Sequence, residues 1–313
     1  MKFNKNKILV LGSNGFLGKN LILELENLQF DFQKLSGKKE LDLHRLKEFQ
    51  NYLIENKIEI IINCSAFVGG IEYGYKYPAD LLVKNTTIAN NIYSASVDTF
   101  VKKIINPISN CAYPENLTVY KENQFWDGKP HESVFHYGIA KRHIIALADA
   151  FFKQHNISSV NVVLSNMYGP LDHFEESRSH ALGALIKKIH YAKLNNLNEV
   201  EIWGTGKPIR EWLYVVDGAN ALISSIDVNE GNYFFNIGVN EGISVFDLAT
   251  IIAKSIGYNG KFVFNTTKPD GVMRKTVDGE LGERILDWKP KIDLATGINI
   301  TVKWYIENYE QLH

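Results

Sequence analysis

A glycine-rich turn between an apolar run and an amphipathic segment constrains the fold of this chain most strongly. The aliphatic run Ile8–Leu11 is followed directly by Gly12-Ser-Asn-Gly15-Phe-Leu-Gly18. The run predicts a buried parallel strand, and the segment that extends to about Leu28 predicts an amphipathic helix. In a strand–turn–helix unit, such glycines permit a tight turn, and the helix N-terminus receives a pyrophosphate. The turn therefore indicates a dinucleotide site in preference to a purely structural turn.

Apolar runs alternate with helical segments as far as Pro170. Further strands are expected at Phe30–Leu35, Ile58–Asn63, Lys103–Ile108 and Ser159–Leu164. Helices are expected at Leu43–Glu55 with Asp42 as N-cap, from Pro78 to about Ser96, and from the segment around Tyr137 to about His155. This alternation predicts an α/β fold with a Rossmann-type, doubly wound parallel sheet and right-handed crossovers.

The pattern changes beyond Pro170, which indicates a smaller α/β domain that binds the substrate. Helices are expected at His180–Lys193, at Ser244–Ile256 with Ser244 as N-cap, and from about Leu294; strands are expected at Val200–Trp203 and Lys261–Phe264. Tyr214–Ser225 and Tyr233–Ile237 are expected to return to the sheet. We therefore assign residues 1–170, with about 211–240, to dinucleotide binding. Residues 171–210 and 241–313 form the smaller domain, which closes over the sheet edge.

Composition excludes several classes of partner. The 313 residues carry a formal net charge of -1, and 45% of them are hydrophobic. We therefore expect neither a nucleic-acid partner nor a metal ion. No apolar run approaches the ~20 residues of a membrane helix, so no membrane partner is expected. The two cysteines, Cys64 and Cys111, make no disulfide framework, which favours a reducing cytoplasm.

The end of the second expected strand bears on the choice of nicotinamide cofactor. NAD enzymes usually place an acidic residue there, about 20 residues past the glycines, to hold the ribose hydroxyls. Here the segment reads Ser36-Gly-Lys38-Lys39. Two lysines suit a 2′-phosphate, which favours NADPH over NAD; the alternative is a solvated loop. Asp42 follows, as an N-cap that also lies near the adenine.

A tyrosine and a lysine four residues apart, Tyr137 and Lys141, are the candidate catalytic pair. On a helix they lie one turn apart on the same face. The ammonium is expected to lower the pKa of the phenol from about 10 towards that of an acid/base catalyst. Such a tyrosine protonates an oxygen as a hydride arrives on its carbon. Ser109, at the end of the fourth strand, is placed to donate a second hydrogen bond to that oxygen.

With these residues assembled, the chain resembles the extended short-chain dehydrogenase/reductases, and within them the GDP-L-fucose synthase family. The resemblance spans essentially the whole chain. The motifs that carry it are Val68-Gly-Gly-Ile71, Tyr77-Pro-Ala-Asp80, Ser109-Asn-Cys-Ala-Tyr-Pro114, Asn166-Met-Tyr-Gly-Pro170, Ser179-His180, Trp203-Gly-Thr-Gly-Lys-Pro-Ile-Arg-Glu211 and Lys268-Pro-Asp-Gly271 with Arg274-Lys275. The resemblance implies NADPH-dependent reduction of a GDP-linked 4-keto-6-deoxy sugar in a cytoplasmic homodimer.

The resemblance also implies roles at matched positions. Tyr137 protonates the C4 oxygen, Lys141 supports it and holds the nicotinamide ribose, and Ser109 hydrogen-bonds the same oxygen. Cys111 and His180 are the base and acid that shift protons at C3 and C5 before reduction. A thiolate–imidazole pair suits such protons near neutral pH. From the residues alone, Cys111 equally fits a small buried hydrophobe, and His180 a local helix-end hydrogen bond.

The remaining implied positions lie around the two ligands. Those implied for the cofactor are Gly12, Ser13, Asn14, Gly15, Phe16, Leu17, Gly18, Lys38, Asp42, Leu43, Lys141, Leu164, Asn166, Met167 and His180. Those implied for the GDP moiety are Lys188, Trp203, Arg210, Lys261 and Lys275. Cations suit a diphosphate, and an indole stacks on guanine. The alternatives are a surface lysine at 188, a core tryptophan at 203 and a structural ion pair at 210.

Departures from the family pattern leave the sugar open. Lys188 stands where the family usually has arginine, which removes a bidentate contact to phosphate. Asn110 replaces a small hydroxyl residue, and Phe135-His136 replaces a proline-containing approach to Tyr137. Ser13-Asn14 stands where well-known members have a basic residue for the 2′-phosphate. The alternatives are a C4 reductase without epimerisation on a deoxyheptose or other surface-glycan sugar, an NAD-dependent 4-epimerase or dehydratase, and a non-catalytic dinucleotide-binding protein.

Overall fold

The computed structural model describes residues 7–37, 40–69, 71–175, 181–268, 270 and 272–312. Its centre is a six-stranded, all-parallel sheet in the order β11-β6-β4-β3-β1-β2. The strands are β1 (Ile8–Leu11), β2 (Phe32–Leu35), β3 (Ile60–Asn63), β4 (Lys103–Ser109), β6 (Ser158–Leu164) and β11 (Asn232–Ile237). The strand order reverses beside β1, which is where ligands bind in doubly wound sheets. The expected α/β fold class is confirmed.

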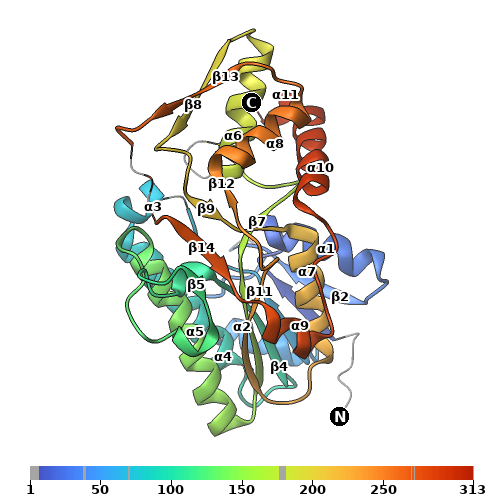
Figure 1. The fold of residues 1–313 in the computed structure, drawn as a ribbon. Helices are drawn as coiled ribbons and strands as arrows, with labels where there is room; N and C mark the ends of the chain where they lie inside the picture. Colours follow the sequence, from blue (N-terminus) through green and yellow to red (C-terminus); the bar gives the residue numbers. More distant parts are fainter. Residues whose placement is uncertain are drawn as a thin grey trace.

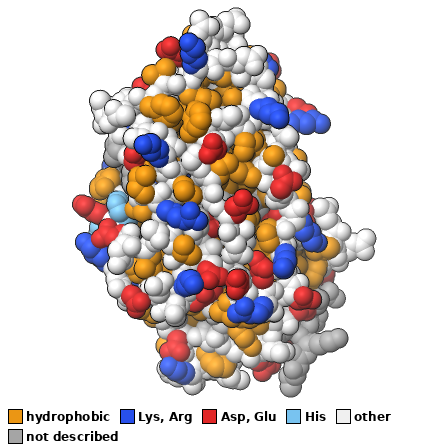
Figure 2. Space-filling model, in the orientation of Figure 1, with side chains coloured by type: hydrophobic (Ala, Val, Ile, Leu, Met, Phe, Trp, Pro, Cys, Tyr) orange, Lys and Arg blue, Asp and Glu red, His pale blue; other side chains and the backbone are white. Residues whose placement is uncertain are grey.

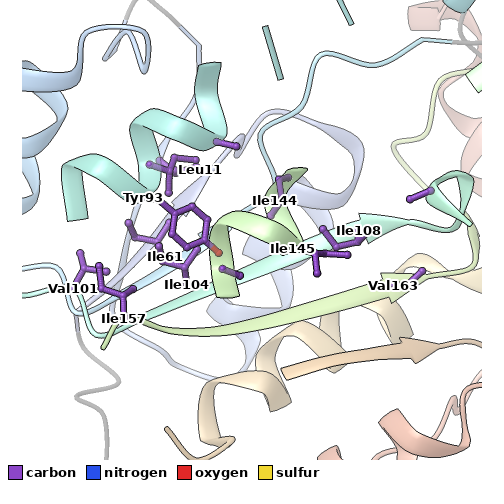
Figure 3. Close-up of a cluster of buried hydrophobic side chains, with 14 of the residues drawn as sticks. Leu11, Ile61, Tyr93, Val101, Ile104, Ile108, Ile144, Ile145, Ile157 and Val163 are labelled. Atoms are coloured by element: carbon purple, nitrogen blue, oxygen red, sulfur yellow. The ribbon is translucent and has the colours of Figure 1, made fainter. Parts of the chain in front are cut away.

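Helices cover both faces of the sheet (Figure 1). On one face lie α2 (Leu46–Glu55), α4 (Pro78–Ser96) and α5 (Phe135–His155); on the other lie α1 (Phe16–Asn27), α7 (Val215–Ser224) and α9 (Glu280–Leu286). The side chains of the inner strands β1, β3 and β6 are buried under both layers, whereas those of the edge strand β2 are half-buried or exposed. Figure 3 shows Tyr93 of α4 packed beside Ile61 of β3 and Ile104 of β4.

A ladder of asparagines crosses the centre of the sheet. Asn106 of β4 and Asn161 of β6 are register partners, and the amide nitrogen of Asn63 on β3 donates to Oδ1 of Asn106 at 3.3 Å. Asn106 donates to Asn161 at 3.0 Å and to the Tyr93 hydroxyl at 2.9 Å. The Tyr93 hydroxyl also contacts the hydroxyl of Ser159 at 3.0 Å. Because buried amides must be hydrogen-bonded, this ladder specifies the register of the strands that carry the site.

The C-terminal half contributes a third apolar cluster, which lies beyond the carboxyl edge of the sheet at the top of Figure 1. Its elements are α6 (Ala181–Leu194), α8 (Val245–Ile256), α10 (Leu294–Glu307), β7 (Asn166–Tyr168), β10 (Trp212–Tyr214), β8 (Glu199–Trp203) and β13 (Lys261–Asn265). Ser244 caps α8 as expected, accepting from Asp247 N at 3.0 Å. The segment Tyr214–Ser225 returns to the sheet as α7, against α1, and β11 pairs with β6, as the sequence indicates.

A small mixed sheet joins the two regions. It contains β12 (Ile243–Ser244), β9 (Ile209–Arg210), β14 (Arg274–Val277) and β5 (Val119–Tyr120). The remaining short elements are α3 (Ile71–Lys76), α11 (Tyr309–Leu312) and the 3₁₀ turns η1 (Asn110–Ala112), η2 (Glu122–Gln124), η3 (Glu132–Val134) and η4 (Ser225–Asp227). Within the described residues, no helix is both long and apolar enough to cross a membrane.

Candidate active site

The glycine turn forms a cradle that side chains would fill. Gly12 has φ +73°, and a Cβ there would lie 2.6 Å from the backbone of Cys64. A Cβ on Gly18 would lie 2.2 Å from the carbonyl oxygen of Gly12. Gly15 is the N-cap of α1 and provides no side-chain cap, so the first amides of this helix remain available. These features fit a pyrophosphate at the helix N-terminus.

Asp42, in the loop after β2, does not cap the following helix as predicted. The helix begins at Leu46, with Arg45 as N-cap, so Asp42 is not the cap. Its carboxylate instead accepts from the backbone N of His44 at 3.1 Å and contacts the same residue's Nδ1 at 2.8 Å. A local Asx turn therefore takes the place of the expected cap. Lys38 and Lys39 lie outside the described residues.

The fourth strand delivers Ser109 and Cys111 to the carboxyl edge. Ser109 ends β4 and caps η1, and its Oγ accepts from the backbone N of Cys111 at 3.2 Å. Because the oxygen is the acceptor there, the hydroxyl hydrogen remains free to donate. Arg142 of α5 fixes this turn by donating from Nε to the carbonyl oxygen of Ala112 at 2.8 Å. It also donates to the carbonyl oxygen of Gly128 at 2.7 Å.

Helix α5 brings Tyr137 and Lys141 to the same place. The Nζ of Lys141 lies 5.6 Å from the centre of the Tyr137 ring and donates to the carbonyl oxygen of Pro107 at 3.2 Å. The prediction that Lys141 lowers the pKa of Tyr137 is wrong for this structure. Burial, followed by the charge of Cys111, raises that pKa. Burial also lowers the pKa of Lys141 to about 8, against a smaller opposing effect of Cys64. Tyr137 is therefore a neutral phenol, able to act as an acid.

The side chains at the end of β6 and in β7 are occupied by contacts within the protein. Leu164 is buried, and the side chain of Met167 packs towards Gly218 of α7 in the same cluster. Asn166 uses its amide nitrogen to bind the carbonyl oxygen of Glu211 at 3.0 Å. His180 lies outside the described residues.

Charges from β9 and β14 converge on Cys111. Lys275 pairs in register with Arg210. Burial lowers the pKa of Lys275, and the charge of Cys111 opposes that effect. The charges of Cys111 and Arg210 also act on the buried Tyr120, in opposite directions. Arg210 donates to the carbonyl oxygen of Ile209 at 2.8 Å. Lys275 thus lies within electrostatic range of Cys111, and Arg210 lies within range of Tyr120.

Trp203 is a surface platform and not a core residue, since 49% of it is exposed. The Nζ of Lys188 lies 4.8 Å from its ring centre, and that of Lys268 lies 5.1 Å away. Lys261 shares the exposed face of the β8–β13 pair but sits at its other end, opposite Glu199. Four residues of strand, about 13 Å, separate it from Trp203. The structure therefore gathers Lys188 and Trp203 but leaves Lys261 apart.

Three functional candidates were missed from sequence. Lys268 belongs to a family-like motif but has no predicted role, and nothing in the sequence singles out Arg142. In the structure, Arg142 is a buried cation that ties α5 to η1. Asp270 accepts from the backbone N of Thr205 at 2.6 Å and from its hydroxyl at 2.8 Å, which fixes the turn after Trp203. The only sequence signal for Asp270 was its place in the family-like Lys-Pro-Asp-Gly motif.

The glycine cradle, the Ser–Tyr–Lys edge and the sheet order together point to one group of enzymes. Residues 8–238 match the NAD dependent epimerase/dehydratase family. The chain belongs to this family. A GDP-L-fucose synthase of Arabidopsis thaliana is 33% identical over 303 residues, 96% of this chain and 94% of the relative. A GDP-L-colitose synthase of Yersinia pseudotuberculosis is 31% identical over 303 residues, 96% and 98% of the two chains.

A solved structure agrees with this assignment. The GDP-mannoheptose C4 reductase of Campylobacter jejuni, with NADP bound, superposes with a TM-score of 0.87 at 27% identity. The match covers 97% of this chain and 99% of the reductase. The resemblance to the GDP-L-fucose synthase family, first seen in the motifs, is confirmed over the full chain.

Proposed function

We propose that this chain catalyses the NADPH-dependent reduction of a GDP-linked 4-keto-6-deoxy sugar at C4. The observation that carries the proposal is the convergence of Ser109, Tyr137 and Lys141 at the sheet edge. The chain is also similar over almost its full length to a GDP-L-fucose synthase and to a GDP-mannoheptose C4 reductase. NADPH supplies the hydride when bound, and the glycine cradle with the open first turn of α1 fits its pyrophosphate.

The chain's own residues account for the proton. Tyr137, neutral because burial raises its pKa, donates its phenolic proton to the C4 oxygen as that oxygen gains charge. Ser109 donates a second hydrogen bond to the same oxygen, since its own acceptor is already satisfied by Cys111 N. Lys141, anchored to the carbonyl oxygen of Pro107, provides positive charge beneath the phenol and binds the nicotinamide ribose.

We infer that the β9–β14 side receives the GDP moiety. Trp203 offers an exposed face for guanine, and Lys188 stands beside it. Lys275 lies close to Cys111, and its register partner Arg210 lies close to Asp270, which binds the turn after Trp203. These two cations suit a diphosphate. Lys261 lies at the far end of the strand pair, so we expect its substitution to change GDP-sugar binding least.

A second activity, epimerisation at C3 and C5, rests on Cys111 and His180. The position of Lys275 favours it, because this lysine lies within electrostatic range of Cys111. The competing function is C4 reduction without epimerisation, on a deoxyheptose or related sugar of surface glycans. The likeness to a GDP-mannoheptose C4 reductase favours that alternative.

Two features of organisation complete the proposal. Residues 1–170 with about 211–240 bind the cofactor, and residues 171–210 with 241–313 bind the nucleotide sugar. Two copies associate through α4 and α5, which already pack against each other within one chain. Size measurement by light scattering tests the homodimer, and a single-chain mass contradicts it.

Turnover with GDP-4-keto-6-deoxymannose tests the main function. We expect one NADPH consumed per sugar reduced, with little turnover of the UDP-linked 4-keto-6-deoxy sugar. NADPH binding without turnover of any GDP-linked keto sugar contradicts the proposal. The same reaction in heavy water distinguishes the two activities: deuterium at C3 and C5 indicates epimerisation, which Cys111→Ser abolishes. Reduced product without deuterium at either carbon indicates a reductase alone.

A further inference from the structure

Glu211 is a buried carboxylate with an unusual set of partners. It lies between β9 and β10 and is only 1% exposed. Its Oε1 accepts from the backbone N of Val239 and its Oε2 from the backbone N of Val277, both at 2.6 Å. Val239 follows β11 of the central sheet, whereas Val277 ends β14 of the small sheet. One carboxylate therefore joins three separate segments.

The backbone around Glu211 leaves no room for another side chain. A Cβ on Gly238 would lie 2.0 Å from Oε1 of Glu211, so the adjoining backbone approaches the carboxylate as closely as glycine allows. The neighbouring Arg210 turns its guanidinium to the carbonyl oxygen of Ile209 and leaves the carboxylate to the amides. Burial raises the pKa of Glu211 to about 7, and the hydrogen bonds from the backbone of Val277 and Val239 oppose that shift.

The position of Glu211 relates this junction to the proposed substrate site. Arg210 precedes Glu211 directly and pairs in register with Lys275. Lys275 in turn precedes Val277, the donor to Oε2, by two residues. The Glu211 carboxylate thus fixes Arg210 through the adjoining backbone and fixes Lys275 through β14. Its hydrogen bond from Val239 links both cations to the edge of the central sheet.

We propose that Glu211 is a positioning residue for nucleotide-sugar binding. It sets the Arg210–Lys275 pair at a fixed place relative to the sheet edge that carries the catalytic residues. This inference rests on the proposed function. It predicts that a defect at Glu211 weakens binding of the diphosphate and spares both the cofactor site and the chemical step.

The test compares Glu211→Gln with Glu211→Asp and with the exposed control Glu310→Gln. Glutamine keeps the shape but only one acceptor oxygen, and aspartate keeps the charge on a side chain too short to reach both amides. For both variants we expect KM for the GDP-sugar to rise about tenfold, as loss of one such hydrogen bond implies. We expect kcat and the Kd of NADPH to stay within about twofold of wild type. The control should match wild type.

An unchanged KM overturns the inference, and so does a parallel loss of NADPH affinity, which would indicate general damage to the fold. If Glu211→Gln fails to fold by circular dichroism, Glu211→Asp alone decides the question. If wild type turns over no GDP-linked keto sugar, the proposed function fails separately. Calorimetry with GDP itself then tests the role of Glu211. We expect the Glu211 variants to bind GDP about tenfold more weakly than wild type, and equal binding would contradict the inference.

Discussion

The ammonium of Lys141 lies 5.6 Å from the centre of the Tyr137 ring, with its Nζ donating to the carbonyl oxygen of Pro107. Lys141 is buried and Tyr137 is half-buried, and burial favours the neutral form of each. The pair therefore starts as a phenol that holds its proton firmly beside an ammonium that loses its proton near neutrality. This arrangement suits an acid catalyst, because the tyrosine must regain a proton after each turnover and the lysine is able to supply one.

Tyr137→Phe removes the proposed proton donor with little change in volume. We expect kcat to fall by about 10²–10⁴, the usual contribution of a positioned acid. NADPH affinity, measured by fluorescence titration, should remain close to wild type. A variant with wild-type kcat would remove Tyr137 from the mechanism.

The acidity of Lys141 predicts a pH limit. Its pKa is lowered to about 8 by burial, so the ammonium is present below that pH and is lost as the pH rises through it. We expect kcat/KM for NADPH to decrease above about pH 8, because this parameter reports groups of the free enzyme. Lys141→Arg should move the decrease above pH 10, whereas Lys153→Arg, on the exposed part of α5, should leave it in place. A profile that stays flat to pH 9.5 in wild type would contradict the assignment.

Trp203→Ala removes the proposed base platform. Since stacking of a base on an aromatic ring contributes about 1–3 kcal/mol, KM for the GDP-sugar should rise roughly five- to 150-fold with kcat nearly unchanged. Trp203→Phe keeps an aromatic face and should recover most of the loss. Equal KM values for the alanine variant and wild type would place guanine elsewhere.

Gly18→Ala tests the cradle. Its Cβ would lie 2.2 Å from the Gly12 carbonyl oxygen, so the turn must move. We expect NADPH affinity to fall by at least tenfold. Gly128→Ala is the matched control, because its nearest contact would be a Pro114 side-chain atom at 3.3 Å. Equal NADPH affinity in the two variants would place the pyrophosphate away from this turn.

Lys103→Met tests a feature of stability. Lys103 is fully buried and donates to the carbonyl oxygens of Ser225, Ile226 and Val228, where α7 and η4 end. Methionine fills similar space but leaves those carbonyls without this donor. We expect the free energy of unfolding in urea to fall by about 3 kcal/mol. Unchanged stability would mean that the carbonyls find other donors.

Much of the fold could be predicted from sequence, because strands such as β1 and β3 are aliphatic runs and helices begin at readable signals such as Pro78 and Ser244. The site was predictable where a motif fixes backbone geometry, as at Gly12. It was not predictable where burial sets the properties of a side chain. The pKa of Tyr137 and the role of Glu211 depend on contacts between segments far apart in the chain. Asp42 was misassigned because an Asx turn and an N-cap share the same residue preferences.

Transfer of deuteride from NADPH labelled at C4 of the nicotinamide tests the central claim most directly. The sugar is GDP-4-keto-6-deoxymannose, and the product is read by mass and by nuclear magnetic resonance. The account predicts one deuteron at sugar C4 for each NADPH consumed, with the signal lost in Tyr137→Phe. Product that forms without deuterium at C4, or NADPH that is bound but never consumed, would contradict it.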